Sequence, residues 1–133
     1  MSPAEIKEVL GIADRDLLES QTAGLSPDWK LGIAYNAALQ LATVALSASG
    51  YRASHEGQHY RVIQSLTLTI GLKSEIVIRF DAFRKKRNIS DYQRAGAVSA
   101  QEAEEMYALA KHLRTKVESW LRENHPELIS QSL

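Results

Sequence analysis

The chain has 133 residues, lacks cysteine, and carries 16 basic and 16 acidic residues, so its formal net charge is zero. This length suits one domain with a hydrophobic core of its own. The lack of cysteine excludes disulfides, thiolate nucleophiles and cysteine-ligated metals. The zero net charge argues against a protein that coats nucleic acid, because such domains usually have isoelectric points above about 9.

The N-terminal residues lack the basic and apolar regions of a signal peptide. No run approaches the ~18 consecutive apolar residues that suggest a membrane span. We therefore expect one cytoplasmic, soluble domain over residues 1–133 that does not associate with membranes. Its tail is expected to fray from about residue 126.

Serine–proline pairs at residues 2–3 and 26–27 mark the starts of the first two expected helices, since serine caps a helix and proline fits its first turn. Glu5 completes a capping box at the first start, and apolar residues then recur at helical spacing through Leu17. The second helix is expected over residues 28–48. Its apolar residues lie on nearly every side, which is typical of the central helix of a bundle.

Glycines separate the next two expected helices. The third is expected from about Gln58 to Ile70, and Gly71 ends it. Ser74 is expected to cap the fourth helix. The apolar stripe of this fourth helix consists of Ile76, Phe80 and Phe83.

The last expected helix begins at a second capping box, Ser99 with Glu102, and ends before Pro126. Its apolar residues alternate between spacings of three and four, which is typical of a coiled-coil-like packing face. No segment alternates with a period of two. The sequence therefore predicts an all-α fold, an up-and-down bundle of four to five helices. The packing face comprises Ala103, Met106, Ala110, Leu113, Val117 and Trp120.

Three aromatic residues are interpreted as structural. Trp29 and Trp120 are expected to pack in the core or at an interface rather than to stack against a ligand. Tyr35 is expected to bury its ring and to keep its hydroxyl in water.

A basic run from Arg84 to Arg87 lies near the end of the fourth expected helix. At about 100° per residue, Arg87 continues the azimuth of the apolar stripe. A guanidinium on that azimuth must meet a carboxylate, a helix end, a second subunit or a ligand, or it must reach water beyond the bundle. Because arginine binds phosphate with bidentate hydrogen bonds, Arg84 and Arg87 are candidate ligand-binding residues.

The sequence RKKRNISDY, on a late helix of a small all-α chain, resembles the HEPN domains. These are nucleotide-binding domains of prokaryotes and higher eukaryotes that often occur in toxin–antitoxin systems. The resemblance covers roughly residues 6–121. It implies a homodimer with a basic cleft between its subunits, which binds a nucleotide, RNA or a nucleotidyltransferase partner and needs no cofactor.

Active HEPN domains are metal-independent ribonucleases, and their motif is an arginine followed, after four to six residues, by histidine. By this resemblance Arg87 is the motif arginine and Asn88 the polar residue after it, whereas Tyr92 stands where histidine is required. Tyrosine, with a reference pKa of about 10, is a weaker base at neutral pH than histidine. The resemblance thus favours a binding module, with a ribonuclease that uses Arg87, Asn88 and Tyr92 as the alternative.

A second motif gives another alternative, which we favour less. The segment His55-Glu56-Gly57-Gln58-His59 matches the H-E-x-x-H pattern, in which two histidines on one helix face bind zinc and the glutamate activates water. Gly57 disfavours a helix there, and a zinc protease needs a third protein ligand. We therefore expect no metal and interpret the segment as a polar turn before the third helix.

Overall fold

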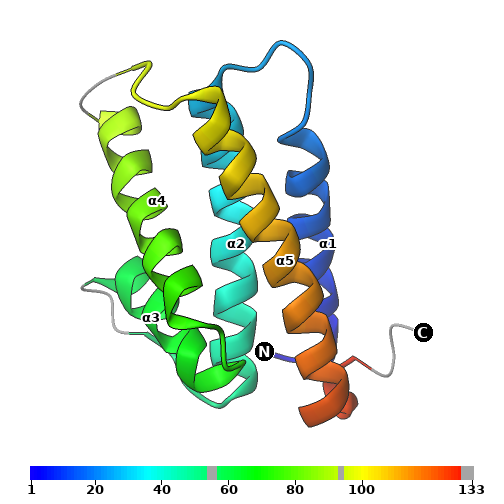
Figure 1. Cartoon of the computed structure of the whole chain (residues 1–133). Coiled ribbons are helices and arrows are strands. Elements are labelled where there is room, and N and C mark those ends of the chain that lie inside the picture. Colours follow the sequence, from blue (N-terminus) through cyan, green and yellow to red (C-terminus); the bar gives the residue numbers. More distant parts are fainter. Residues whose placement is uncertain (54–56, 93–94, 130–133) are drawn as a thin grey trace.

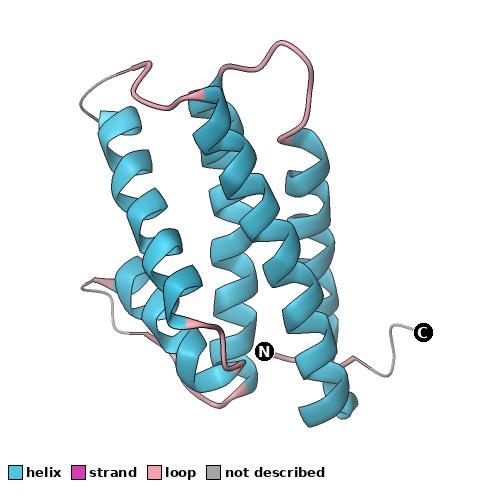
Figure 2. Ribbon diagram, viewed as in Figure 1, coloured by secondary structure: helices cyan, strands magenta, loops and turns pink. Residues whose placement is uncertain are grey.

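The computed structural model describes residues 1–53, 57–92 and 95–129, and of residues 90–92 the backbone only. Within these residues the chain forms five α-helices, one short 3-10 helix and no β-strand, which confirms the predicted all-α bundle (Figure 1, Figure 2). The elements are α1 (Pro3–Glu19), α2 (Pro27–Ala48), α3 (Gln58–Thr69), α4 (Ser74–Tyr92), α5 (Ala100–Asn124) and η1 (Pro126–Leu128).

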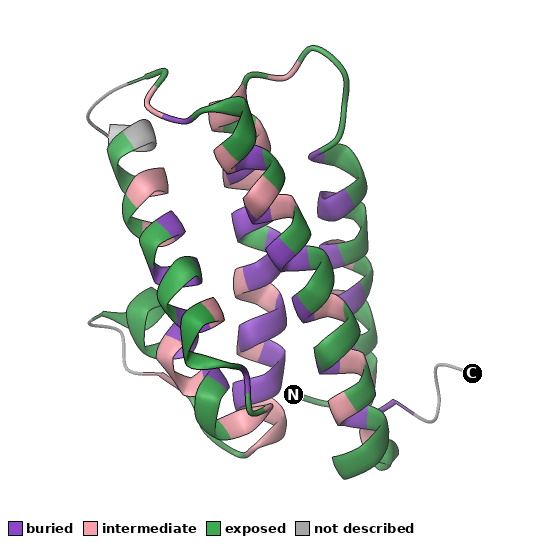
Figure 3. Ribbon diagram, viewed as in Figure 1, coloured by how far each residue is buried: buried purple, intermediate pink, exposed green. Residues whose placement is uncertain are grey.

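The central element of the bundle is α2, which contacts all four other α-helices. α1 and α5 lie on one side of it and α3 and α4 on the other, and α1 and α4 run opposite to α2 and α5 (Figure 1). Ten residues of α2 are buried, and buried positions of the neighbouring helices face it (Figure 3). Five of the ten are alanines, which let the neighbouring backbones approach closely.

Among the described residues, α2 is also the one helix whose length and composition would allow it to cross a membrane. It has 22 residues and a mean hydropathy of 1.4, and 56% of this apolar segment is buried inside the fold. Burial against four helices accounts for an apolar surface on every side.

Serine caps begin three helices as predicted. Ser2 Oγ accepts a hydrogen bond from the Glu5 amide at 3.2 Å, and Ser99 Oγ accepts one from the Glu102 amide at 3.0 Å, both within complete capping boxes. Ser26 Oγ accepts from the Trp29 amide at 3.2 Å. These caps satisfy amides that have no partner within their own helices.

The fourth helix starts one residue earlier than a Ser74 cap predicts. Ser74 is its first helical residue, and the carbonyl of Lys73 accepts the first hydrogen bonds, from the amides of Ile76 and Val77. Val77 is almost fully buried, whereas Ile76 is only partly buried. The core-facing stripe of α4 therefore begins at Val77.

The packing face of the last helix differs from the prediction at its end. Leu121 rather than Trp120 continues the packing face of α5, because a straight helix turns slightly less than a strict alternation of three and four requires. Trp120 instead lies beside His125, with ring centroids 4.9 Å apart. Beyond α5, Pro126–Leu128 forms η1 and Ile129 is buried; the rest of the tail lies outside the described residues, so its expected fraying stays a prediction.

Asp28 joins the start of α2 to the loop between α4 and α5. Its Oδ2 accepts a hydrogen bond from the Gly96 amide at 2.6 Å, and its Oδ1 accepts one from the Val98 amide at 3.2 Å. Gly96 has a φ of 79°, a conformation that side-chain-bearing residues rarely adopt. The carboxylate thereby fixes residues 96–98, which lead into α5.

Replacing Asp28 with alanine removes the acceptor for both loop amides. Because Val98 is buried, its amide has little access to water, and we expect the free energy of unfolding to fall by about 1–3 kcal/mol. Urea denaturation followed by circular dichroism measures this change. As a control, Asp14→Ala breaks an exposed ion pair with Arg114 and should cost less than about 1 kcal/mol. Equal losses in the two variants would contradict the prediction.

Candidate functional site

Arg87 continues the buried stripe of α4, as the sequence predicts. Phe80 and Phe83 are buried, and Arg87 is half-buried one turn further on. The helix continues to Tyr92, so Arg87 lies within α4 rather than at its end. Its guanidinium carbon lies 5.2 Å from the centroid of the Tyr35 ring on α2. The side chain therefore meets an aromatic face inside the bundle, where a cation is attracted by the ring.

Tyr35 is fully buried, which contradicts the expectation that its hydroxyl stays in water. Its ring packs edge-on against Phe80, with centroids 5.7 Å apart, and its hydroxyl lies 3.4 Å from Nδ1 of His59 on α3. Burial raises the pKa of Tyr35 to about 12, although Arg87 and Arg84 act in the opposite direction. The phenol therefore keeps its proton at neutral pH.

Arg84 is held by a short ion pair within α4. Its Nε donates to Oδ1 of Asp81 at 2.6 Å, and Asp81 is 8% exposed. This hydrogen bond raises the pKa of Arg84 further above its already high value. The guanidinium carbon also lies 5.5 Å from the centroid of the Tyr60 ring, on α3.

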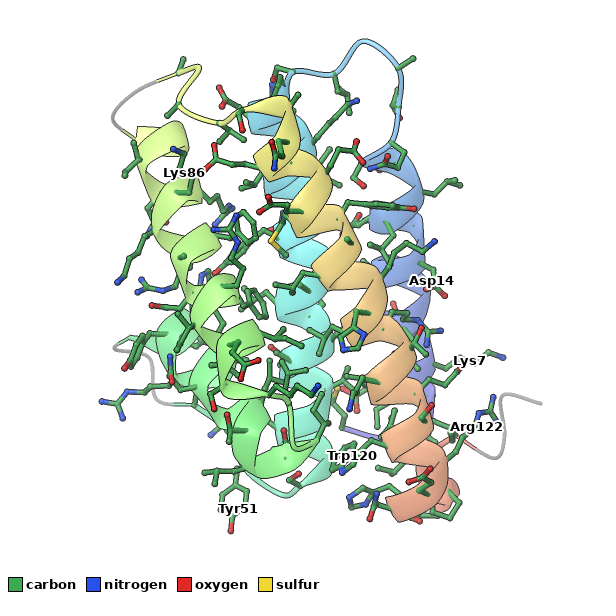
Figure 4. All side chains as sticks on the ribbon, in the orientation of Figure 1. Lys7, Asp14, Tyr51, Lys86, Trp120 and Arg122 are labelled. Carbon is green, nitrogen blue, oxygen red and sulfur yellow. The ribbon has the colours of Figure 1, made fainter. Side chains whose placement is uncertain are left out.

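The two lysines of the basic run have carboxylate partners as well. Lys85 Nζ lies 3.7 Å from Asp81, and Lys86 Nζ lies 3.5 Å from Glu102. Lys86, labelled in Figure 4, thus connects α4 to the first turn of α5. The run is therefore not a uniform positive patch, because two nearby carboxylates, Asp81 and Glu102, offset part of its charge.

An open depression lies between the start of α3 and the second half of α4. It has a volume of about 320 Å³, and its lining includes His59, Tyr60, Arg84 and Asn88. Arg84 and Asn88 are four residues apart on α4 and so share one face of the helix. The depression thus combines a guanidinium, an amide and an imidazole, which together suit an oxyanion.

His59 is the histidine of this depression. Partial burial lowers its pKa below the ordinary value, and the positive charges of Arg87 and then Arg84 lower it further. The imidazole is therefore neutral at pH 7. One nitrogen faces the Tyr35 hydroxyl, which leaves Nε2 to interact with a ligand.

The structure brings Arg84, Asn88 and His59 together, with Arg87 beside them. Tyr92 is the last residue of α4, and its side chain lies outside the described part of the chain, so its role stays a prediction. The sequence did not associate Tyr35 or His59 with the basic run, because the three segments meet only in the folded chain. The one available signal was the position of Tyr35 on the expected central helix.

The zinc-protease pattern finds little support in the described residues. His55 and Glu56 lie outside them. Gly57 adopts a left-handed conformation with a φ of 66°, and α3 begins after it, so His59 does not belong to a helix that runs back through Gly57. Within residues 1–53, 57–92 and 95–129, no group of three histidines or carboxylates lies close enough to hold a metal ion.

Comparisons with known proteins do not assign the chain to a family. No family model matches it, and no curated protein matches it either. The resemblance to the HEPN domains therefore stays a prediction from the sequence motif and the helical pattern.

The environment of His59 can be tested by titration. We expect its pKa to lie below 6.5 and to rise in Arg84→Gln, though not fully, because burial and Arg87 still disfavour the charged ring. Proton–carbon NMR of the ring Cε1–H groups measures it, with His59→Gln identifying the resonance.

Lys85→Gln serves as the control, since the side chain of Lys85 is 68% exposed, and it should shift the pKa less. The folded protein disfavours the charged form of His59, so protonation of this ring favours unfolding. The free energy of unfolding is therefore unaffected by the titration of His59 above pH 6.5, and it decreases as the pH falls from 6.5 through the lowered pKa of His59. If the NMR titration of His59 in the wild-type protein has its midpoint at or above pH 6.5, the described environment of this histidine is wrong.

Proposed function

We propose that the protein is an HEPN-like binding module of a toxin–antitoxin or nucleotide-linked system. In this proposal it holds a phosphate group of a nucleotide or of RNA in the depression lined by Arg84, Asn88 and His59. The observation that carries the proposal is the meeting of two arginines with a neutral histidine, in a chain whose net charge is zero. The resemblance adds a homodimer, a nucleotidyltransferase partner and no cofactor, and the sequence pattern adds a cytoplasmic location.

The local contacts suit phosphate binding. Asp81 accepts a hydrogen bond from Nε of Arg84, which holds the guanidinium in place and directs its Nη groups elsewhere. A preorganised guanidinium loses less side-chain entropy when it binds an oxyanion. Asn88 can donate from its amide, and His59 can donate from Nε2 when Nδ1 accepts the proton of the Tyr35 hydroxyl.

Metal-independent ribonuclease activity is the second candidate, because His59 supplies the imidazole that the Arg87-to-Tyr92 motif lacks. A neutral His59 could take the proton of the 2′-hydroxyl through Nε2 in the other tautomer, in which Nδ1 carries the ring proton and donates it to the Tyr35 hydroxyl oxygen. The departing 5′-oxygen also needs a proton donor. Tyr35 is a poor donor, since it is buried and its pKa is about 12. Among the described residues that line the depression, His59 is also the only histidine, so no second imidazole is present to act as the acid, which favours binding over cleavage.

The binding proposal predicts that Arg84→Gln weakens the affinity for a fluorescein-labelled single-stranded RNA about tenfold, the effect of losing a charge-assisted hydrogen bond. Fluorescence anisotropy at near-physiological salt measures the affinity. Lys85→Gln removes an equal charge from the same helix and should change the affinity by less than about twofold. If both variants weaken binding equally, the interaction is unspecific electrostatics and the proposal fails.

The preference for binding over cleavage predicts that the purified protein leaves the same RNA intact. Denaturing gel electrophoresis after prolonged incubation measures the remaining full-length strand. Products with 2′,3′-cyclic phosphate ends that disappear in both Arg87→Ala and His59→Gln would instead establish the ribonuclease. Cleavage that persists in both variants would indicate a contaminating enzyme and would not count as activity of this protein.

A further inference from the structure

A second hollow lies next to the proposed phosphate site, between the first half of α2 and the end of α4. It has a volume of about 630 Å³, and its lining includes Trp29, Gly32, Ile33, Asn36 and Arg87. We refer to it as the Trp29 groove. Arg87 lies within one helical turn of both Arg84 and Asn88, so the groove and the depression share the same segment of α4.

Trp29 is the most unusual residue of this groove. It is 67% exposed, so of the two expected places, core or interface, the core of this chain does not hold it. Its backbone is fixed, because its amide donates to the Ser26 cap. Hydration of an exposed indole is unfavourable in free energy. At the fixed start of a helix, the indole provides a flat apolar face on which a planar ligand can stack.

Space for such a ligand exists along α2. Gly32 follows Trp29 by one turn, and no heavy atom lies within 4 Å of the position that a Cβ would take there. A side chain at this position would project into the groove beside the indole. The glycine therefore leaves room for a flat group to lie against the helix.

Asn36 provides the hydrogen-bonding groups. It is exposed, it lines the groove, and its side chain forms no hydrogen bond with another described residue. An amide offers one acceptor and two donors in a plane, which matches the edge of a nucleobase. Asn36 also follows Tyr35, whose ring lies under the Arg87 guanidinium, so amide and cation lie at the same end of the groove.

The charges define an orientation for the ligand. Asp28 lines the end of the groove near Trp29, and its two oxygens accept hydrogen bonds from the Gly96 and Val98 amides. Its negative charge disfavours a phosphate there. Arg87 lies at the other end, which adjoins the depression with Arg84 and Asn88. A ligand with an uncharged ring and a phosphate would therefore place the ring at Trp29 and the phosphate toward α4.

We propose that the Trp29 groove binds an unpaired nucleobase, which stacks on Trp29 and forms hydrogen bonds with Asn36. This inference rests on the proposed function, since base and phosphate are taken to belong to one ligand. It assigns Trp29 and Asn36 a role in binding single-stranded RNA or a free nucleotide.

The chain offers a direct readout, because it contains only two tryptophans. In a Trp120→Phe variant, all tryptophan emission comes from Trp29. We expect a short single-stranded RNA to quench this emission saturably. An abasic strand of the same length, or inorganic phosphate, should leave it nearly unchanged, because neither brings a ring to the indole. A free nucleoside monophosphate distinguishes a nucleotide ligand from an RNA ligand.

Affinity measurements complete the test. Trp29→Ala should weaken RNA binding about tenfold, as expected for the loss of one stacked base, and Asn36→Ala should weaken it about threefold. Tyr51→Ala is the matched control, because Tyr51 is another exposed aromatic residue and lies at the opposite end of the bundle (Figure 4). Circular dichroism verifies that each variant is folded.

Two outcomes would overturn the inference, and they differ in what they imply for the phosphate site. If RNA binding depends on Arg84 but neither quenches Trp29 nor weakens in Trp29→Ala, the groove is not a base site and the proposed function stands. If neither RNA nor a nucleoside monophosphate binds, both proposals fail. In that second case, emission that changes with protein concentration, together with a doubled mass by light scattering, would identify the groove as a contact between two copies.

Discussion

The structure depends on the burial of α2, a helix that is apolar on every side and therefore has to be enclosed. Four neighbours are needed to cover it, and its alanines allow them to approach closely. This constraint places α3 and α4 side by side against one flank of α2. It also puts Tyr35, a residue of the enclosed helix, underneath the basic run of α4. The candidate site is thus a consequence of how the core is covered.

The polar groups around Tyr35 follow from its burial. A phenol removed from water needs a hydrogen-bond partner, and His59 is positioned to provide one. Partial burial beside two arginines in turn keeps this histidine neutral. Asp81 balances Arg84 and holds it in place. Each group thereby sets the state of the next, and the result is a fixed cationic site with a neutral imidazole beside it.

Local signals predicted much of the fold. Three serine caps, the central helix and the five-helix pattern were all accessible from the sequence, because capping and helical periodicity are properties of short segments. Arg87 was located on the buried stripe by the same periodicity. The partners of Arg87 were not accessible, since Tyr35 and His59 belong to other helices and meet it only through tertiary packing. For Trp29 the sequence left the core and an interface open as alternatives, and only the packing of the neighbouring helices shows that its indole stays exposed.

The same geometry links ligand binding to protonation. The arginines disfavour a proton on His59 while the site is empty, and a bound phosphate would offset part of their positive charge. By thermodynamic linkage, a ligand that raises the pKa of His59 must bind more tightly to the protonated form. Phosphate binding through Arg84 alone would have no such dependence, because arginine keeps its charge throughout the physiological range. A modest gain in affinity below neutral pH that His59→Gln removes would therefore separate a ligand in contact with the imidazole from one held only by the surrounding positive charge.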